Sequence, residues 1–124
     1  MESIQQVFFG SQTSGSSNSF YTAKSAKQFV DITLSVSAAD AIASYTIESS
    51  AEPFNSWAQD TTAVTISTLP PGITRTGGVV SVASPAIGSY RLRFALDSGP
   101  YVRVTYAYTS GAVISTRVVI SAHD

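Results

Sequence analysis

The feature that most constrains this chain is the alternation of apolar and polar residues along its sequence after residue 26. The alternation is clearest in four runs, which are residues 30–36, 90–96, 102–108 and 114–120. Successive side chains of a β-strand point to opposite faces, so a period of two predicts strands with one buried face and one solvated face. No run predicts a stable helix, because the best candidate, residues 37–44, is too short to stand alone.

Shorter apolar runs at residues 45–47, 64–66 and 79–82 predict further strands, and turn-forming residues separate all of these runs. Pro and Gly in LPPG, residues 69–72, and the Gly pair in TGG, residues 76–78, interrupt strand pairing and permit tight turns. Many strands with regular breaks are typical of two packed antiparallel sheets. We therefore predict an all-β fold, namely a single antiparallel β-sandwich of about seven to eight strands.

The composition predicts one domain with a largely neutral exterior. At 124 residues the chain is long enough to bury one core and too short for two well-formed ones. Hydrophobic residues make up 44% and charged residues 12%, about half of the usual charged share, so Ser and Thr must cover much of the surface. Such a surface loses little charge hydration when it packs into an assembly.

Charge, cysteine content and the length of the apolar runs exclude several classes of protein. The formal net charge is −1 and the seven basic residues are scattered, whereas nucleic-acid binding requires a dense basic patch. The chain has no cysteine, which removes disulfides and thiolate metal sites. Residues 1–6 lack the features of a secretory signal, and no run approaches the roughly 20 apolar residues that cross a bilayer. We therefore expect no nucleic-acid partner, no membrane, and synthesis and folding in a cytoplasm.

Residues that carry catalysis or bind metals are sparse. His123 is the sole histidine and lies beside the C-terminus, so we expect neither a Ser-His-Asp relay nor a histidine metal site. The eight acidic residues form no closely spaced pair, and Asp97 fits a turn before Ser98 and Gly99. No Gly-rich phosphate loop precedes a helix. We therefore predict no catalytic residue, no metal, no cofactor and no enzymatic activity.

The N-terminal segment combines an apolar run, residues 4–9, with a Gly- and Ser-rich stretch, residues 10–19. One interpretation is a first strand with a long loop inside the same sandwich. The other is an arm that docks on a neighbouring subunit through Val7, Phe8 and Phe9. We divide the chain accordingly into an N-terminal arm and tether, residues 1–19, and a sandwich domain, residues 20–124.

Aromatic residues mark the remaining candidate contacts. The polar connection at residues 49–60 contains Phe54 and Trp57, which is the only tryptophan. These side chains either anchor a partner or cap the open end of the core. In a sugar-binding protein, Trp57 and Tyr101 would stack on the sugar rings. The candidate partner-binding residues are therefore Val7, Phe8, Phe9, Phe54, Trp57 and Tyr101.

Three arginines, Arg91, Arg93 and Arg103, occupy polar positions of the alternating runs. If their strands pair, these side chains lie together on an outward face and form a small basic patch. The alternative is a solvated strand face that resists aggregation at the sheet edge.

Residues 69–99 resemble the immunoglobulin-like domains of the cadherin-like type. Those domains read Leu-Pro-x-Gly-Leu, then a short strand after a Gly turn, a Pro, and Gly-x-Tyr at the start of a long strand. The matching residues here are Leu69, Pro70, Gly72, Ile73, Gly78, Pro85, Gly88, Tyr90, Asp97 and Gly99. The resemblance implies an immunoglobulin-like sandwich in which Gly72 has a positive φ and Tyr90 acts as a tyrosine corner. The acidic calcium ligands of cadherins are missing, so calcium-dependent adhesion does not carry over.

Two classes of function fit these expectations. The first is a non-enzymatic structural virion protein, made in the host cytoplasm, which decorates or cements a bacteriophage capsid, tail or fibre. Its partners would be other virion proteins and copies of itself in a homo-oligomer, because a repeated patch gains avidity in a symmetric assembly. The alternative is an extracellular carbohydrate-binding or cell-surface adhesive module with a glycan partner. We favour the first, because no larger parent chain or secretory signal supports the second.

Overall fold

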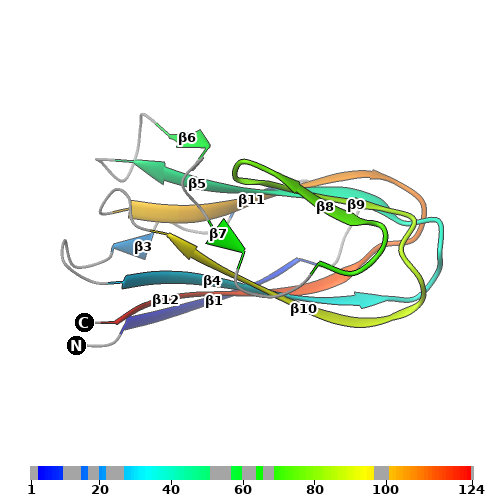
Figure 1. Ribbon diagram of the computed structural model, residues 1–124, viewed down its shortest axis with the longest axis horizontal. Coiled ribbons are helices and arrows are strands. Elements are labelled where there is room, and N and C mark those ends of the chain that lie inside the picture. The colour runs from blue at the N-terminus through cyan, green and yellow to red at the C-terminus, as the bar shows by residue number, and fades with distance from the viewer. Residues whose placement is uncertain are drawn as a thin grey trace.

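The computed structural model describes the backbone of residues 3–9, 15–16, 20–21, 27–50, 57–59, 64–65, 69–96 and 101–123. Every regular element in these residues is a β-strand, and the strands form two antiparallel sheets that face each other (Figure 1). Eight of the described strands have four residues or more, and four have two residues. The prediction of an all-β antiparallel sandwich of about seven to eight strands is confirmed.

The strands divide between sheet A and sheet B. Sheet A has the order β1-β12-β4-β10-β7. Its strands are β1 (Ser3–Phe9), β12 (Ser115–His123), β4 (Lys27–Val36), β10 (Gly88–Leu96) and β7 (Val64–Thr65). Sheet B has the order β2-β11-β5-β9-β8, with β3 also on β11 and β6 on β5. Its strands are β2 (Gly15–Ser16), β3 (Phe20–Tyr21), β11 (Tyr101–Ser110), β5 (Ile42–Ser50), β9 (Val79–Ala83), β8 (Ile73–Thr76) and β6 (Ala58–Gln59).

The first half of the chain pairs with the second half in reverse order. β1 pairs with β12, β2 and β3 pair with β11, β4 pairs with β10, and β5 pairs with β9. A long antiparallel hairpin that is rolled up across two sheets in this way has the strand order of a jelly roll. The order differs from that of immunoglobulin domains, whose last two strands lie in one sheet, because β11 lies in sheet B and β12 in sheet A. The alternating sequence pattern is compatible with both strand orders, because both folds bury one face of every strand.

The core consists of the apolar positions of the alternating runs. In β4, Val30, Ile32 and Leu34 are completely buried, whereas Thr33 and Ser35 are exposed. The same alternation of buried and less buried positions continues through most of β5, β10 and β11. Burial of one such aliphatic side chain contributes about 1.5–3 kcal/mol, so the facing inner surfaces of the two sheets hold the fold together.

A hydrogen bond through the core joins the two sheets. Tyr45 of β5 and Thr116 of β12 are both buried, and their hydroxyl groups are hydrogen-bonded. Thr116 also donates to the carbonyl of Ile114 at 3.3 Å, so Tyr45 is the donor to Thr116. Burial raises the pKa of Tyr45 above its ordinary value, and it does the same for Tyr106, whose ring centroid lies 5.3 Å from that of Tyr45.

Two features that the resemblance of residues 69–99 implies are confirmed. Gly72 has a φ of +86°, and a Cβ atom there would lie 2.9 Å from Cα of Pro85, so this turn requires glycine. The Tyr90 hydroxyl donates to the carbonyl of Ala86 at 2.6 Å, which is the bond of a tyrosine corner. Together they shape the chain at the entry to β10.

Residues 3–9 lie in sheet A as β1, and their backbone pairs with β12 of the same chain. Val7, Phe8 and Phe9 lie opposite Val118, Arg117 and Thr116 in the register. This arrangement corresponds to the first of the two alternatives for the segment, a first strand inside the sandwich. Docking of the same segment on a neighbouring subunit stays a prediction, as does the domain boundary at residue 19.

Candidate functional site

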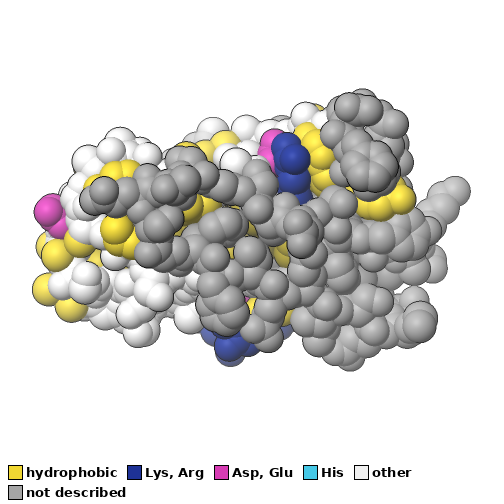
Figure 2. All heavy atoms as spheres, turned by 180° about the vertical axis from the view of Figure 1, so that it is seen from behind, with side chains coloured by type: hydrophobic (Ala, Val, Ile, Leu, Met, Phe, Trp, Pro, Cys, Tyr) yellow, Lys and Arg dark blue, Asp and Glu magenta, His cyan; other side chains and the backbone are white. Residues whose placement is uncertain are grey.

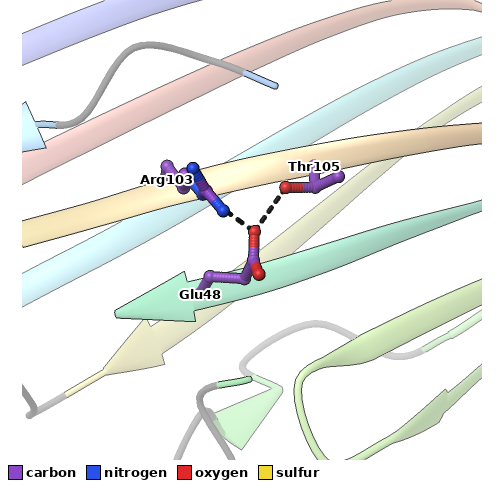
Figure 3. A network of polar contacts seen from close by, with 3 residues as sticks. All are labelled: Glu48, Arg103 and Thr105. Carbon is purple, nitrogen blue, oxygen red and sulfur yellow. Dashed lines mark hydrogen bonds and ion pairs between the residues drawn. The ribbon is translucent and has the colours of Figure 1, made fainter. Parts of the chain in front are cut away.

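A cluster of polar side chains lies on the outer face of sheet B, where β5 pairs with β11. Glu48 of β5 lies opposite Arg103 of β11 in the register. The Arg103 Nε group donates to Glu48 Oε1 at 2.9 Å, and the Thr105 hydroxyl donates to the same oxygen (Figure 3). The side chains of Glu48 and Arg103 are 16% and 28% exposed. This ion pair is therefore partly shielded from water and fixed by a second donor, which makes it stronger than a fully exposed pair.

Trp57 packs on this cluster. The guanidinium carbon of Arg103 lies 4.3 Å from the centroid of the Trp57 ring, which is a cation–π contact. Trp57 directly precedes β6, where Gln59 lies opposite Glu48 and accepts a hydrogen bond from the Gly78 amide at 3.1 Å. Trp57 itself is partly exposed. The ring is thus held on the outer face of sheet B, and Trp57 is not among the side chains that pack against the described core.

Tyr101 shares the outer face of β11 with Arg103. The two residues are two positions apart in the strand, and side chains with that spacing point to the same face. Tyr101 lies opposite Ser50 of β5 and Tyr21 of β3, and it is partly buried. The structure therefore brings two of the six predicted contact residues, Trp57 and Tyr101, to one face beside Arg103.

The other predicted contacts lie outside what the structure describes. Phe54 falls outside the described residues. Val7, Phe8 and Phe9 have a described backbone in β1, but their side chains belong to the undescribed part. Their role in binding a partner stays a prediction.

Of the two alternatives for Arg91, Arg93 and Arg103, the shared basic patch is wrong. Arg91 and Arg93 lie in β10 of sheet A, whereas Arg103 lies in β11 of sheet B, so they occupy different sheets. The chain crosses between sheets from β10 to β11, and a local sequence pattern does not reveal such a crossing. Figure 2 shows basic side chains in two separate places, one at the upper edge beside an acidic side chain and one at the lower edge.

Two residues of the cluster, Glu48 and Thr105, were not among the predicted contacts. Both occupy outward positions of strands, where charged and hydroxyl side chains are the usual occupants, so neither is conspicuous in the sequence. The signal that identifies them is the register of β5 against β11, which places Glu48 opposite Arg103.

Other kinds of site were sought in the part of the chain that the structure describes. There, no group of three or more His, Cys, Asp or Glu side chains is arranged to hold a metal ion. The same residues contain no helix that is long and apolar enough to span a membrane. The predicted lack of metal, cofactor and catalytic activity stays a prediction.

Comparison with known proteins assigns no family to the chain. No protein-family model, curated protein or solved structure matches it. Its candidate function is therefore inferred from the geometry of its own surfaces.

Proposed function

We propose that this protein is a non-enzymatic structural component of a bacteriophage virion that binds other virion proteins, and copies of itself, through the outer face of sheet B. The observation that carries the proposal is the position of Trp57, whose partly exposed ring rests on a guanidinium that Glu48 holds in place. Aromatic side chains and arginines contribute much of the energy at protein interfaces. A ring that is fixed before binding loses little conformational freedom on association.

The surroundings of the cluster support a contact surface. Along β5 and β9, the partly exposed positions Ser44, Thr46 and Ser81 carry small or hydroxyl side chains, which can pack against a partner without burying unpaired charge. Jelly rolls recur in viral capsid proteins. That last support is an analogy of fold, because one fold serves many functions.

The test compares the parent chain with Trp57→Ala in a host that produces the particles. We expect to find the unmodified protein in particles purified on a density gradient. The variant should be at least about tenfold less abundant there, because it lacks an interface anchor. Because Trp57 lies on an outer face, the two melting temperatures should agree within about 4 °C.

Ile87→Ala is the matched control, since Ile87 is 68% exposed and lies between β9 and β10, away from the cluster. It removes exposed apolar surface but should enter particles normally. Absence of the parent chain from particles would contradict the virion proposal, and normal entry of Trp57→Ala would contradict the role of the cluster.

A second candidate function is carbohydrate binding, which is favoured by the position of Trp57 and Tyr101 on one face beside the Glu48 carboxylate. Aromatic rings with a few polar groups are typical of small-ligand sites, and jelly rolls also occur in lectin domains. Trp57 is the only tryptophan, so its fluorescence reports directly on this face. Saturable changes of that fluorescence with one class of oligosaccharide would favour this candidate, and an unchanged spectrum across a glycan panel would reject it.

A further inference from the structure

The outer face of sheet A carries a second, independent constellation of charged residues. Strand β4 lies between β10 and β12, so Thr33 has Arg91 opposite it on one side and Arg117 on the other. Neighbouring strands are about 4.8 Å apart, which places the two arginine backbones roughly 10 Å apart with Thr33 between them. All three residues are exposed, and neither arginine forms an ion pair with a carboxylate of the described residues. Two guanidinium groups are therefore available to one acidic group above Thr33.

Asp31 occupies the next outward position of β4. It is only 9% exposed, and its Oδ1 atom has no hydrogen-bond partner among the described residues. The nearest cation, Arg93 of β10, has its Nε atom 3.8 Å from Oδ1, which is too long for a hydrogen bond. Buried polar atoms are nearly always paired, so the described residues leave the Asp31 carboxylate short of a hydrogen-bond donor.

These groups line one hollow. Its walls are formed by Asp31, Thr33, Arg91, Arg117 and Val119, and its volume is about 310 Å³. That size is at the lower end of the range for small-ligand sites. Asp31 and the two arginines thus line the same hollow.

We propose that this hollow binds an acidic side chain of a partner protein. The carboxylate of a Glu residue lies between Arg91 and Arg117 beside the Thr33 hydroxyl, and a main-chain N–H of the same segment donates to the exposed part of the Asp31 carboxylate. Arginines bind carboxylates with directed, charge-assisted hydrogen bonds, and a peptide provides the donor that Asp31 lacks.

The choice of a protein ligand rests on the proposed function and on one feature of this face. None of the described residues that line the hollow is aromatic, so the hollow offers no ring on which a sugar can stack. The acidic partner also complements the surplus of arginine over aspartate in the hollow.

The test is a nuclear magnetic resonance titration of the full chain at low salt with N-acetyl-glutamate N-methylamide. We expect saturable shifts of the Arg91 and Arg117 side-chain Nε–H signals and of the β4 amides. Arg91→Gln and Arg117→Gln should each weaken binding about tenfold, because each removes a charge-assisted bond. Arg75→Gln is the matched control, since it removes the same charge from sheet B and should leave binding unchanged.

Further ligands and one variant separate the two halves of the site. N-acetyl-glutamine N-methylamide, which lacks the charge, should bind at least about tenfold more weakly. Acetate, which lacks the N–H donor, should bind more weakly than the blocked glutamate. In Asp31→Val the ratio of these two affinities should fall toward one, a readout that a general change of charge does not produce. Spectra of each variant establish that it is folded.

Several results would overturn the proposal. They are equal binding of the blocked glutamine and glutamate, an Arg75→Gln effect equal to that of Arg91→Gln, or tighter binding of glucuronate, which would identify an acidic sugar as the ligand. The titration uses the isolated chain, so its outcome is independent of whether the chain enters particles. Failure of the virion proposal and failure of this site are therefore distinguishable.

Discussion

The outer faces of the two sheets each place an arginine directly opposite a carboxylate, with different results. On sheet B, Arg103 bonds Glu48 at 2.9 Å and Thr105 donates to the same oxygen. On sheet A, Arg93 lies 3.8 Å from Asp31, and Oδ1 of Asp31 has no hydrogen-bond partner in the described part of the chain. We call the Arg103–Glu48 pair closed, because its groups form a direct hydrogen bond. We call the Arg93–Asp31 pair open, because its groups are too far apart for one.

We infer that side-chain length accounts for the difference, because arginine and carboxylate are direct cross-strand partners in both pairs. Each arginine is a direct cross-strand partner of its carboxylate, and each guanidinium also covers an aromatic ring, Trp57 on sheet B and Phe29 on sheet A. Glutamate is one methylene longer than aspartate and reaches an arginine that is drawn onto a ring. We therefore expect one methylene group to decide whether such a pair forms a direct hydrogen bond or leaves the carboxylate open to another donor.

The largest expected effect comes from opening the closed pair. Glu48→Ala should lower the free energy of unfolding by about 2 kcal/mol, since it leaves Arg103 partly buried without its partner. Glu48→Asp should cause about half that loss, because the shorter carboxylate repeats the geometry of sheet A. Urea unfolding followed by circular dichroism measures both. A Glu48→Asp variant as stable as the parent would show that side-chain length does not explain the difference.

A medium effect is expected from the bond that joins the two sheets. Tyr45→Phe should lower the free energy of unfolding by about 1 kcal/mol, because it removes the donor to Thr116. Since this bond joins the two sheets, the loss should affect both sheets alike. Because burial raises the pKa of Tyr45 and Tyr106 in the folded protein, their contribution to stability is complete below the ordinary tyrosine value of about 10. It is lost as the pH rises above that value, because the unfolded chain ionises first.

Alkaline unfolding with tyrosinate absorbance measures this dependence. Above pH ~10, the free energy of unfolding of Tyr45→Phe should fall less steeply than that of the unmodified protein. Tyr108→Phe, which changes a less buried tyrosine, is the control. Ionisation of all tyrosines before unfolding would contradict the expectation.

The smallest effect is expected from closing the open pair. Asp31→Glu should raise the free energy of unfolding by about 0.5 kcal/mol, because the longer side chain reaches Arg93. The same variant should bind N-acetyl-glutamate N-methylamide more weakly, because the new Glu carboxylate is already hydrogen-bonded to Arg93. If Asp31→Glu gains stability but binds the ligand as tightly as before, the Asp31 carboxylate takes no part in binding.

The facing of individual side chains was predictable from the sequence. Alternation assigns Thr33, Arg91 and Arg103 to polar faces and the neighbouring apolar residues to the core, and the structure confirms this assignment. The run at residues 45–47 is the centre of the longer strand β5, Ile42–Ser50, because the alternation continues on both sides of it.

The composition of the candidate sites was not predictable in the same way. Trp57 and Tyr101 are conspicuous as large aromatics, but the sequence left open whether their common neighbour Arg103 lies beside Arg91. The true neighbour of Arg91 across Thr33 is Arg117, from a strand at the other end of the sequence. Cross-strand neighbours depend on which strands pair, and a strand with alternating residues can pair with many others.

The sequence by itself determined that this chain forms strands, and which side chains of each strand turn inward, because both follow from the local geometry of an extended backbone. Only the tertiary structure decided which strands lie side by side, as in the pairing of Ser3 with Ala122. That choice depends on the joint packing of both sheets around one core, which no short segment encodes. It sets Arg103 against Glu48 in a closed pair and leaves Asp31 open beside Arg91 and Arg117.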